Sequence, residues 1–568
     1  MAAGTDSWPK KSQEVYEPQL QAILNVKKFR MPSVNSSVEN EFPVVRFPRW
    51  VVCPKCRRLN DYKGFVSFLR ASERLECTEC KKTPYPARLV IACSKGHIED
   101  FPWRWWVHGT DPCDRPVLVL NSSSKTASLA GISVYCKNCN KSRSLGEAFT
   151  RGVIPFKCTG KRPWLINASD EECDAPIRTL QRGASNLYYS SVVSTLSIPP
   201  WSEDLITELQ GNPYWPALKL IPESKLIETI SDLNLPLELG KSVEELYKTV
   251  KMLRDKIFED ENEIQKITPE ELRELEFQAI SEGTTVDTAS RDFEANAVEV
   301  HRYYNEVIGA VRRVDRLREV RVLQGFTRID PPQTGSFQPQ NLAAITLDTS
   351  PDWLPAIEMR GEGIFVEFQE EKLQEWEKRP TVIARTDKIN NHYSHLVQSS
   401  GGFFSSRQIS PRLLLAHTFA HLLIRQFSLV CGYSSSALRE RLFVREPDQA
   451  SVGHAAILLY TATPDSEGSL GGLIRQSSSD RLGALISGAL EEARWCSSDP
   501  LCIESAGQGY QALNLAACHA CCLLPETCCE EFNRFLDRGL VVGTPQYPET
   551  GFFSSVIEKL VASTNQGV

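Results

Sequence analysis

Cys518-His-Ala-Cys-Cys-Leu-Leu-Pro-Glu-Thr-Cys-Cys529 holds the densest group of thiols in this chain of 568 residues. Five of these twelve residues are cysteines, and Cys496 and Cys502 lie shortly before them. Thiols at this density either pair as disulfides or hold a metal ion as thiolates. The choice between these two states decides what kind of domain forms at the C-terminal end.

Two features of the chain favour metal binding. Residues 1–17 are polar and lack the apolar stretch of a secretory signal. The most apolar run, Leu413–Ile424, has 12 residues, whereas a membrane span needs about 20. We therefore expect a cytoplasmic protein without a membrane segment, in which thiols stay reduced and closely spaced cysteines bind zinc.

Zinc takes four ligands at tetrahedral corners. The expected ligands of the C-terminal stretch are Cys502, Cys518, Cys521 and Cys529. The doubled cysteines leave the choice open by one position, at Cys522 and Cys528, and Cys496 could replace Cys502.

Two further zinc sites are predicted nearer the N-terminus. The knuckles Cys53-Pro-Lys-Cys56 and Cys77-Thr-Glu-Cys80 form a zinc-ribbon pattern. Cys136-Lys-Asn-Cys139 is a third knuckle, and we expect Cys158 and Cys173 to complete its site. Whether another site forms stays open for Cys93, His97, His108 and Cys113, because their spacing matches no standard knuckle.

His417 and His421 lie four residues apart, a spacing that can present two zinc ligands on one helix face. A metalloprotease helix would carry glutamate where Thr418 stands. We therefore expect two histidines packed in a core or an interface. A metallohydrolase that uses both of them with Asp465 is a minor alternative.

The charge of the chain is uneven. Residues 44–183 hold 24 basic and 13 acidic side chains, whereas residues 251–300 hold 6 basic and 14 acidic ones. A basic module beside an acidic segment fits a nucleic-acid-binding face, although a solvated surface with uneven salt bridges explains the counts equally well.

Apolar spacing predicts helices between residues 203 and 325. Thr268-Pro-Glu-Glu271 has the pattern of a capping box. Ala295–Leu323 is expected to be an amphipathic helix, on which Arg312, Arg313 and Arg316 either follow DNA phosphates or pair with the acidic segment.

A nucleotide-binding loop needs the pattern GxxxxGK[ST]. Asp465–Gly472 is rich in glycine but has no lysine, and Gly240-Lys-Ser242 has Leu235 at the position of the first glycine. We therefore expect no ATP hydrolysis by this chain.

Several motifs together resemble the DrmB family, the accessory subunits of the DISARM anti-phage defence system, and the C-terminal part resembles a cysteine-rich domain found on some superfamily-two helicases. The matching stretches are Cys53–Cys56, Gly96-His97 with Asp100–Trp103, Gln181–Asn186, Leu317–Val320 with Gly325–Arg328, His417–His421, Asp465–Gly472 and Cys518–Arg538.

The resemblance implies a subunit that is not an enzyme and that pairs with a DrmA-like helicase as a heterodimer. It also implies recognition of phage DNA with single-stranded or overhanging ends, and a mainly helical C-terminal domain clamped by four cysteines and zinc. A purely structural scaffold without its own DNA contacts is the alternative.

We thus expect a multidomain α+β protein. Its predicted parts are an arm (1–43), a basic zinc-ribbon-like module (44–202), a helical segment (203–332) and a mainly helical zinc-clamped domain (333–568).

Overall fold

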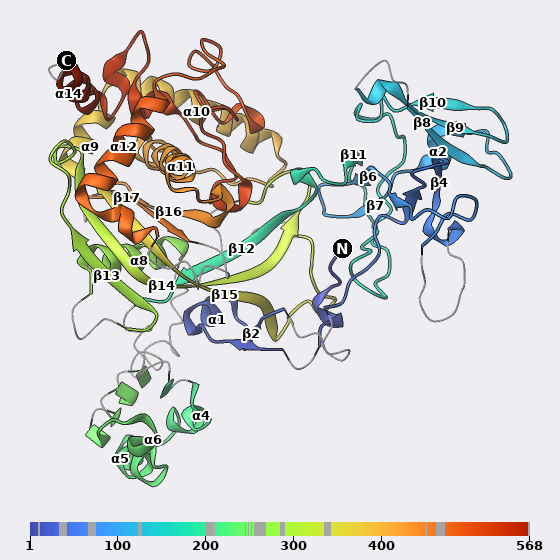
Figure 1. Ribbon diagram of the computed structural model, residues 1–568. Helices are drawn as coiled ribbons and strands as arrows, with labels where there is room; N and C mark the ends of the chain where they lie inside the picture. The colour runs from blue at the N-terminus through green and yellow to red at the C-terminus, as the bar shows by residue number, and fades with distance from the viewer. Residues whose placement is uncertain are drawn as a thin grey trace.

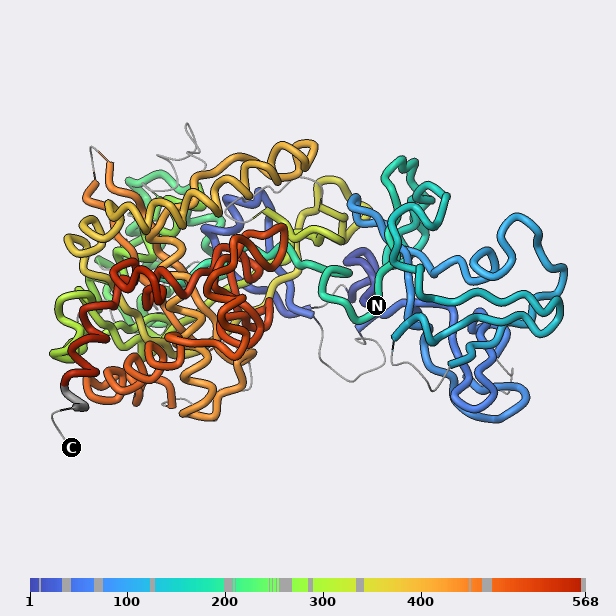
Figure 2. The backbone as a smooth tube through the Cα atoms, turned by 90° about the horizontal axis from the view of Figure 1, so that it is seen from above, coloured from blue at the N-terminus to red at the C-terminus, as the bar shows by residue number. Residues whose placement is uncertain are grey.

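The computed structural model shows a chain of three parts (Figure 1). A large C-terminal body surrounds a central helix, a part built from short strands lies at the opposite end, and a small group of helices stands apart from both. The view from above shows the same separation of the N-terminal strands from the C-terminal body (Figure 2). The structure describes all residues except 10–11, 33–41, 66–74, 123–127, 199–207, 210, 245, 248, 252, 255–267, 285–289, 334–341, 449–450, 462–471 and 566–568.

Two long antiparallel strands, β14 (Ile308–Thr327) and β15 (Trp353–Phe368), connect the parts. One portion of β14 pairs with β13 (Phe293–Val298) and another with β12 (Tyr189–Leu196). β15 is flanked by two strand pairs from opposite ends of the chain: β1 (Glu14–Val15) with β2 (Lys28–Arg30), and β16 (Leu438–Arg445) with β17 (His454–Thr461). The sheet of eight strands therefore contains segments from the expected arm, the N-terminal module and the C-terminal domain.

β13 and β14 occupy the stretch Ala295–Leu323, so the prediction of a helix there is wrong. Val311 packs into the C-terminal core, whereas Val314 and Leu317 pack into a separate cluster. The pairing register with β15 also shifts between Val314 and Leu317. Two covered faces and a bulge produce apolar residues at every third position, which is the spacing that indicates a helix in a sequence.

Helices do form elsewhere in the middle segment. α4 (Trp215–Leu218), α5 (Glu223–Asp232) and α6 (Leu235–Leu239) enclose an apolar cluster of their own. α8 (Pro269–Glu282) begins at the predicted capping box, in which the Thr268 side chain accepts the N–H of Glu271 and the Glu271 carboxylate accepts the N–H of Thr268. The capping-box prediction is confirmed.

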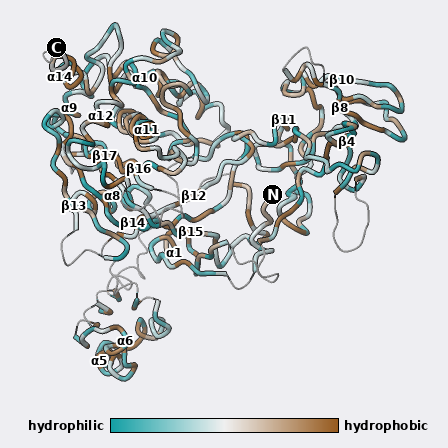
Figure 3. The backbone as a smooth tube through the Cα atoms, viewed as in Figure 1, coloured by the Kyte–Doolittle hydropathy of each residue, from teal (hydrophilic) through white to brown (hydrophobic). Residues whose placement is uncertain are grey.

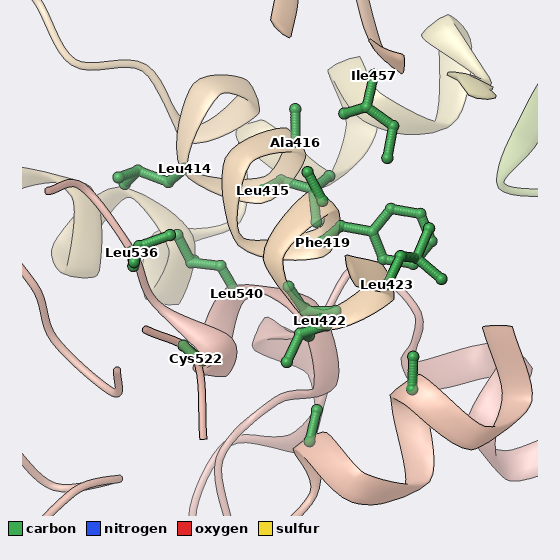
Figure 4. Close-up of a cluster of buried hydrophobic side chains, with 14 of the residues drawn as sticks. Leu414, Leu415, Ala416, Phe419, Leu422, Leu423, Ile457, Cys522, Leu536 and Leu540 are labelled. Carbon is green, nitrogen blue, oxygen red and sulfur yellow. The ribbon is translucent and has the colours of Figure 1, made fainter. Parts of the chain in front are cut away.

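α11 (Pro411–Cys431) is the central helix of the C-terminal body. Every residue from Leu414 to Ile424 is buried, so the helix is covered on all sides. Figure 4 shows Ile457 of β17 near one part of the helix and Leu536, Leu540 and Cys522 near another. Each fully buried leucine or phenylalanine contributes about 2 kcal/mol, so this packing is a major part of the stability.

α11 is also the one helix within the described ranges that is long and apolar enough to cross a membrane. In its most apolar window 72% of the residues are buried inside the protein, and Figure 3 shows the hydrophobic colour of this helix. The helices around it are α9 (Glu370–Glu377), α10 (Pro380–Ser399), α12 (Ser479–Ala493), α13 (Arg538–Val542) and α14 (Ser554–Asn565).

Short strands build the N-terminal part. One sheet contains β3 (Trp50–Val52), β4 (Arg58–Asp61), β5 (Tyr85–Pro86), β8 (Leu118–Ser122), β9 (Ile132–Cys136) and β10 (Ser142–Ser144). A second contains β6 (Leu89–Ala92), β7 (Ile98–Asp100) and β11 (Arg178–Gln181). Trp103 and Trp106 of α2 (Trp103–His108) pack between them in one core cluster. Strands this short bury little apolar area, so this part needs further cross-links.

Arg318 on β14 holds a buried ionic network that joins the N-terminal segment to the large sheet. Its Nη1 donates to Glu17 Oε2 at 3.0 Å, just before α1 (Pro18–Leu24), and its Nη2 donates to Glu358 Oε2 at 3.0 Å. Asp292 lies 3.8 Å from its Nε. Burial raises the pKa of Glu17 to about 7, although the Arg318 charge opposes this shift. Asp292 and Glu358 also pair with Arg360, at 2.5 and 3.1 Å, so Glu17 is the carboxylate that depends on Arg318.

We predict that Arg318→Met lowers the free energy of unfolding by about 3 kcal/mol, because it leaves the buried Glu17 without its cation. The matched control is Arg313→Met on the same strand. Arg313 is 44% exposed and pairs with Asp315, so its loss should change stability by less than about 1 kcal/mol. Chemical denaturation of the two variants measures the difference, and equal effects would contradict the role given to Arg318.

Candidate metal centres

Four groups of cysteine and histidine side chains each bring four ligand atoms to within 4.8 Å of one another. Site I is Cys53, Cys56, Cys77 and Cys80; site II is Cys93, His97, Cys158 and Cys173; site III is His108, Cys113, Cys136 and Cys139; site IV is Cys496, Cys502, Cys518 and Cys521. All 18 cysteines of the chain are free thiols. The clusters are therefore not disulfides.

The distances fit a zinc ion. Sulfurs around tetrahedral zinc lie about 3.8 Å apart, because each Zn–S bond is about 2.3 Å long. In site I the sulfurs of Cys56 and Cys77 are 3.6 Å apart. In site IV the sulfurs of Cys518 and Cys521 are 3.8 Å apart, as are those of Cys502 and Cys521.

The knuckles of sites I and III share one backbone turn. In each, the N–H of the residue directly after the second cysteine donates to the carbonyl of the first cysteine: Arg57 to Cys53, Lys81 to Cys77 and Asn140 to Cys136. These three closing residues have φ values of 60°, 54° and 61°. The recurrence of one turn at three places explains why each CxxC pair supplies two ligands from one local structure.

Backbone N–H groups inside these turns favour the thiolate, which is the form that binds a metal. Burial opposes ionisation of Cys136, but the N–H groups of Cys139 and Asn138, together with His108, lower its pKa to about 6. At Cys53, burial is likewise outweighed by the N–H groups of Cys56 and Lys55, which lower its pKa to about 7.

Sites II and III correct the predicted grouping of Cys136, Cys139, Cys158 and Cys173. The structure divides these cysteines between two sites. Cys136 lies opposite Leu118 in the β8–β9 pairing, near the segment that follows α2 and carries Cys113. Pairing between strands thus determines which cysteines share a site, and spacing along the chain does not predict this grouping.

The remaining two cysteines, Cys158 and Cys173, lie beside the turn between β6 and β7, where Cys93 and His97 stand. Cys93 Sγ is 4.0 Å from Cys173 Sγ and 3.4 Å from His97 Nδ1. The four residues left open by spacing therefore form no site of their own. Cys93 and His97 complete the site of Cys158 and Cys173. His108 and Cys113 complete the site of Cys136 and Cys139.

Both histidines are oriented by a second contact. His97 directs Nδ1 toward Cys93, and its Nε2 lies 2.8 Å from Glu171 Oε2. His108 Nδ1 donates to the Arg104 carbonyl at 2.7 Å, so the buried Nε2 is the ring nitrogen that is available to a metal. A second contact of this kind fixes the ring nitrogen that faces a metal.

Site IV differs from the predicted set at one ligand. Cys496 Sγ lies 3.5 Å from Cys518 Sγ, whereas Cys529 stands outside the site and 3.0 Å from His417 Nε2. Asp499 holds the loop after α12 in place, because its carboxylate accepts the Cys496 N–H at 2.8 Å and the Arg538 guanidinium at 2.6 Å. Cys496 therefore replaces Cys529.

The three arginines predicted to meet DNA lie on β14, and each has a partner within the chain. Arg312 Nε donates to the Ser281 carbonyl at 3.0 Å, and Arg313 pairs with Asp315 at 2.8 Å. Arg316 donates to the Ser290 carbonyl at 3.0 Å and lies 3.3 Å from Glu294. These contacts agree better with arginines that pair within the chain than with arginines that are free to bind DNA phosphates.

Comparison with known proteins supports this assignment of zinc. Residues 1–189 match the model of a domain of unknown function (DUF8724), and residues 419–522 match the MrfA Zn-binding domain. The chain is 34% identical over 565 residues to the DISARM protein DrmB of Bacillus paralicheniformis, with 96% of each chain covered. The zinc-binding match contains all four residues of site IV. Zinc is the cofactor of this chain.

We predict that Cys496→Ser removes one zinc equivalent per chain, because three ligands hold zinc poorly. Cys522→Ala is the matched control, since Cys522 is buried next to Cys521 but belongs to none of the four sites. Elemental analysis of the purified variants makes the comparison. Zinc retained in Cys496→Ser and lost in Cys522→Ala would overturn this choice of ligands.

Proposed function

This chain belongs to the DrmB family of DISARM proteins, and on that premise we propose that it is a zinc-stabilised, non-catalytic subunit that binds phage DNA in the cytoplasm together with a DrmA-like helicase. The observation that carries the DNA-binding part of the proposal is the positive charge of the N-terminal module. The preferred DNA would have single-stranded or overhanging ends, as the resemblance to the family implies.

The charge excess survives metal binding. Residues 44–183 carry 24 basic and 13 acidic side chains. Sites I, II and III together hold ten thiolates and three divalent ions, which leaves the module with a net charge of about +7. A module with that charge attracts nucleic acid strongly at low ionic strength.

Lysines on the zinc knuckles supply free cations. Lys55 and Lys137 lie inside the CxxC turns of sites I and III, and Lys81 directly follows the second knuckle of site I. All three are exposed, and none forms an ion pair with a described residue. Because the metals fix the turns, these ammonium groups are held at defined positions where they can contact phosphates.

The surroundings of the only Gly-Lys-Ser sequence support a role without ATP hydrolysis. Gly240 ends α6 in the left-handed conformation (φ 62°). A phosphate-binding loop instead follows a strand. The glycine-rich loop Asp465–Gly472 lies outside the described residues apart from its last position. Motor activity would therefore come from the helicase partner.

A scaffold subunit without DNA contacts is the second candidate. It is favoured by the internal partners of Arg312, Arg313 and Arg316, which leave β14 without a free basic face.

We predict that Lys55→Glu, Lys81→Glu and Lys137→Glu combined weaken binding of tailed DNA by the helicase complex about tenfold or more, and lower the dependence on salt, because about three phosphate contacts are lost. Fluorescence anisotropy across a salt series measures both quantities. Arg313→Glu with Arg316→Glu is the control and should have a smaller effect.

Zinc content and co-purification with the helicase must be unchanged in both variants. Under those conditions, unaltered DNA affinity in the triple variant would contradict DNA binding by this module and favour the scaffold.

A further inference from the structure

A fifth group of ligand atoms lies inside the C-terminal core. His417 and His421 on α11, Glu440 on β16 and Cys529 after the turn at Glu526–Cys528 bring one atom each to within 4.8 Å of one another. The two histidines and Glu440 have no exposed surface, and Cys529 is 4% exposed. Of this group, His421 and Glu440 lie within the matched zinc-binding region, whereas His417 and Cys529 lie outside it.

The separations suit a small tetrahedral ion. His417 Nε2 is 3.0 Å from Cys529 Sγ and 3.1 Å from Glu440 Oε1. His421 Nε2 is 3.5 Å from Glu440 Oε2. Ligand atoms around tetrahedral zinc lie about 3.3 to 3.8 Å apart, given bonds of about 2.0 to 2.3 Å, so the His421–Glu440 separation fits and the two His417 separations would widen by up to about 0.5 Å around an ion. The histidines reach one point because residues i and i+4 share a helix face.

The hydrogen bond of His421 to the backbone fixes which nitrogen can bind a metal. His421 Nδ1 lies 2.9 Å from the Cys522 carbonyl and must donate to it. A neutral His421 therefore turns the lone pair of Nε2 toward the Glu440 carboxylate. Neither His421 Nε2 nor Glu440 Oε2 forms a hydrogen bond within the described part of the chain. Two buried acceptors that face each other are satisfied either by a metal ion or by a proton on Nε2.

Backbone N–H groups stabilise the anionic ligands. The N–H of Asn533 donates to Cys529 Sγ at 3.2 Å, and the N–H of Glu530 donates to Glu440 Oε1 at 3.0 Å. One thiolate, one carboxylate, two neutral imidazoles and a divalent ion sum to zero charge. With no ion, the same core would have to bury a charged imidazolium or leave its acceptors unpaired.

We propose that His417, His421, Glu440 and Cys529 form a fifth metal centre, site V, which holds one zinc ion. Nitrogen, oxygen and sulfur donors in this combination suit zinc. Four protein ligands fill the tetrahedron and leave no position for a water molecule, so site V is structural. This excludes the hydrolytic role that the two histidines and Asp465 suggest from the sequence, and Asp465 itself lies outside the described residues.

Site V explains the doubled cysteines of the C-terminal stretch. Cys521 belongs to site IV and Cys529 to site V. Cys522 packs in the core and supplies the carbonyl for His421, whereas Cys528 Sγ donates to the Ser435 carbonyl at 3.0 Å. One thiol of each pair binds a metal and its neighbour packs, so the stretch is anchored at both ends.

Elemental analysis of the full chain tests the proposal. We expect five zinc ions per chain in the wild type, four in Cys529→Ala, and five in Cys528→Ala, which removes the neighbouring buried thiol that lies outside every site. Cys529→His keeps a ligand and should restore the fifth ion.

Four or fewer ions in the wild type, or five in Cys529→Ala, would overturn site V. If Cys529→Ala does not fold, the wild-type zinc count and the Cys529→His variant still decide. Histidine at position 529 restores the fifth zinc ion only if this position supplies a ligand.

Discussion

Tetrahedral coordination of zinc is the constraint on which the rest of this structure depends. Each of the four cysteine-rich sites fixes the mutual positions of backbone segments that are far apart in the chain. The sites in the N-terminal part are also nested, since all ligands of site III lie between His97 and Cys158 of site II. Strands of two to five residues cannot bury enough apolar surface to hold such an arrangement alone. Metal binding therefore supplies folding energy that the small cores lack.

The two ends of the molecule are stabilised differently. The N-terminal part depends on metal sites between short strands, whereas the C-terminal body combines a metal site with a large core around α11. The long strands β14 and β15 join them, and the buried network around Arg318 holds the first residues of the chain against this connection. The sheets of the N-terminal part are separate from this one, and Val90 and Ile98 pack against Val320 and Phe326 of β14, so a ligand held by the N-terminal part would be linked to the helical body through this packing and through β14 and β15.

Local signals were predictable from the sequence, and pairings between distant segments were not. The CxxC knuckles appear where expected because each is one turn with its own hydrogen bonds. The partners of Cys139 and Cys158 depend on which strands pair, and no spacing reveals that. β14 resembles a helix because bulges and two covered faces give apolar residues a period of three. Glu440 carries no sequence signal at all, since a glutamate in a strand is ordinarily a surface residue.

Zinc ions between these side chains would distinguish metal centres from packed thiols and from disulfides. Anomalous X-ray diffraction from crystals of the full chain, recorded above and below the zinc absorption edge, tests this directly. The account predicts an anomalous peak within each of sites I to IV and a fifth between His417, His421, Glu440 and Cys529. Electron density for S–S bonds without zinc peaks, or a single peak shared by Cys136, Cys139, Cys158 and Cys173, would contradict it.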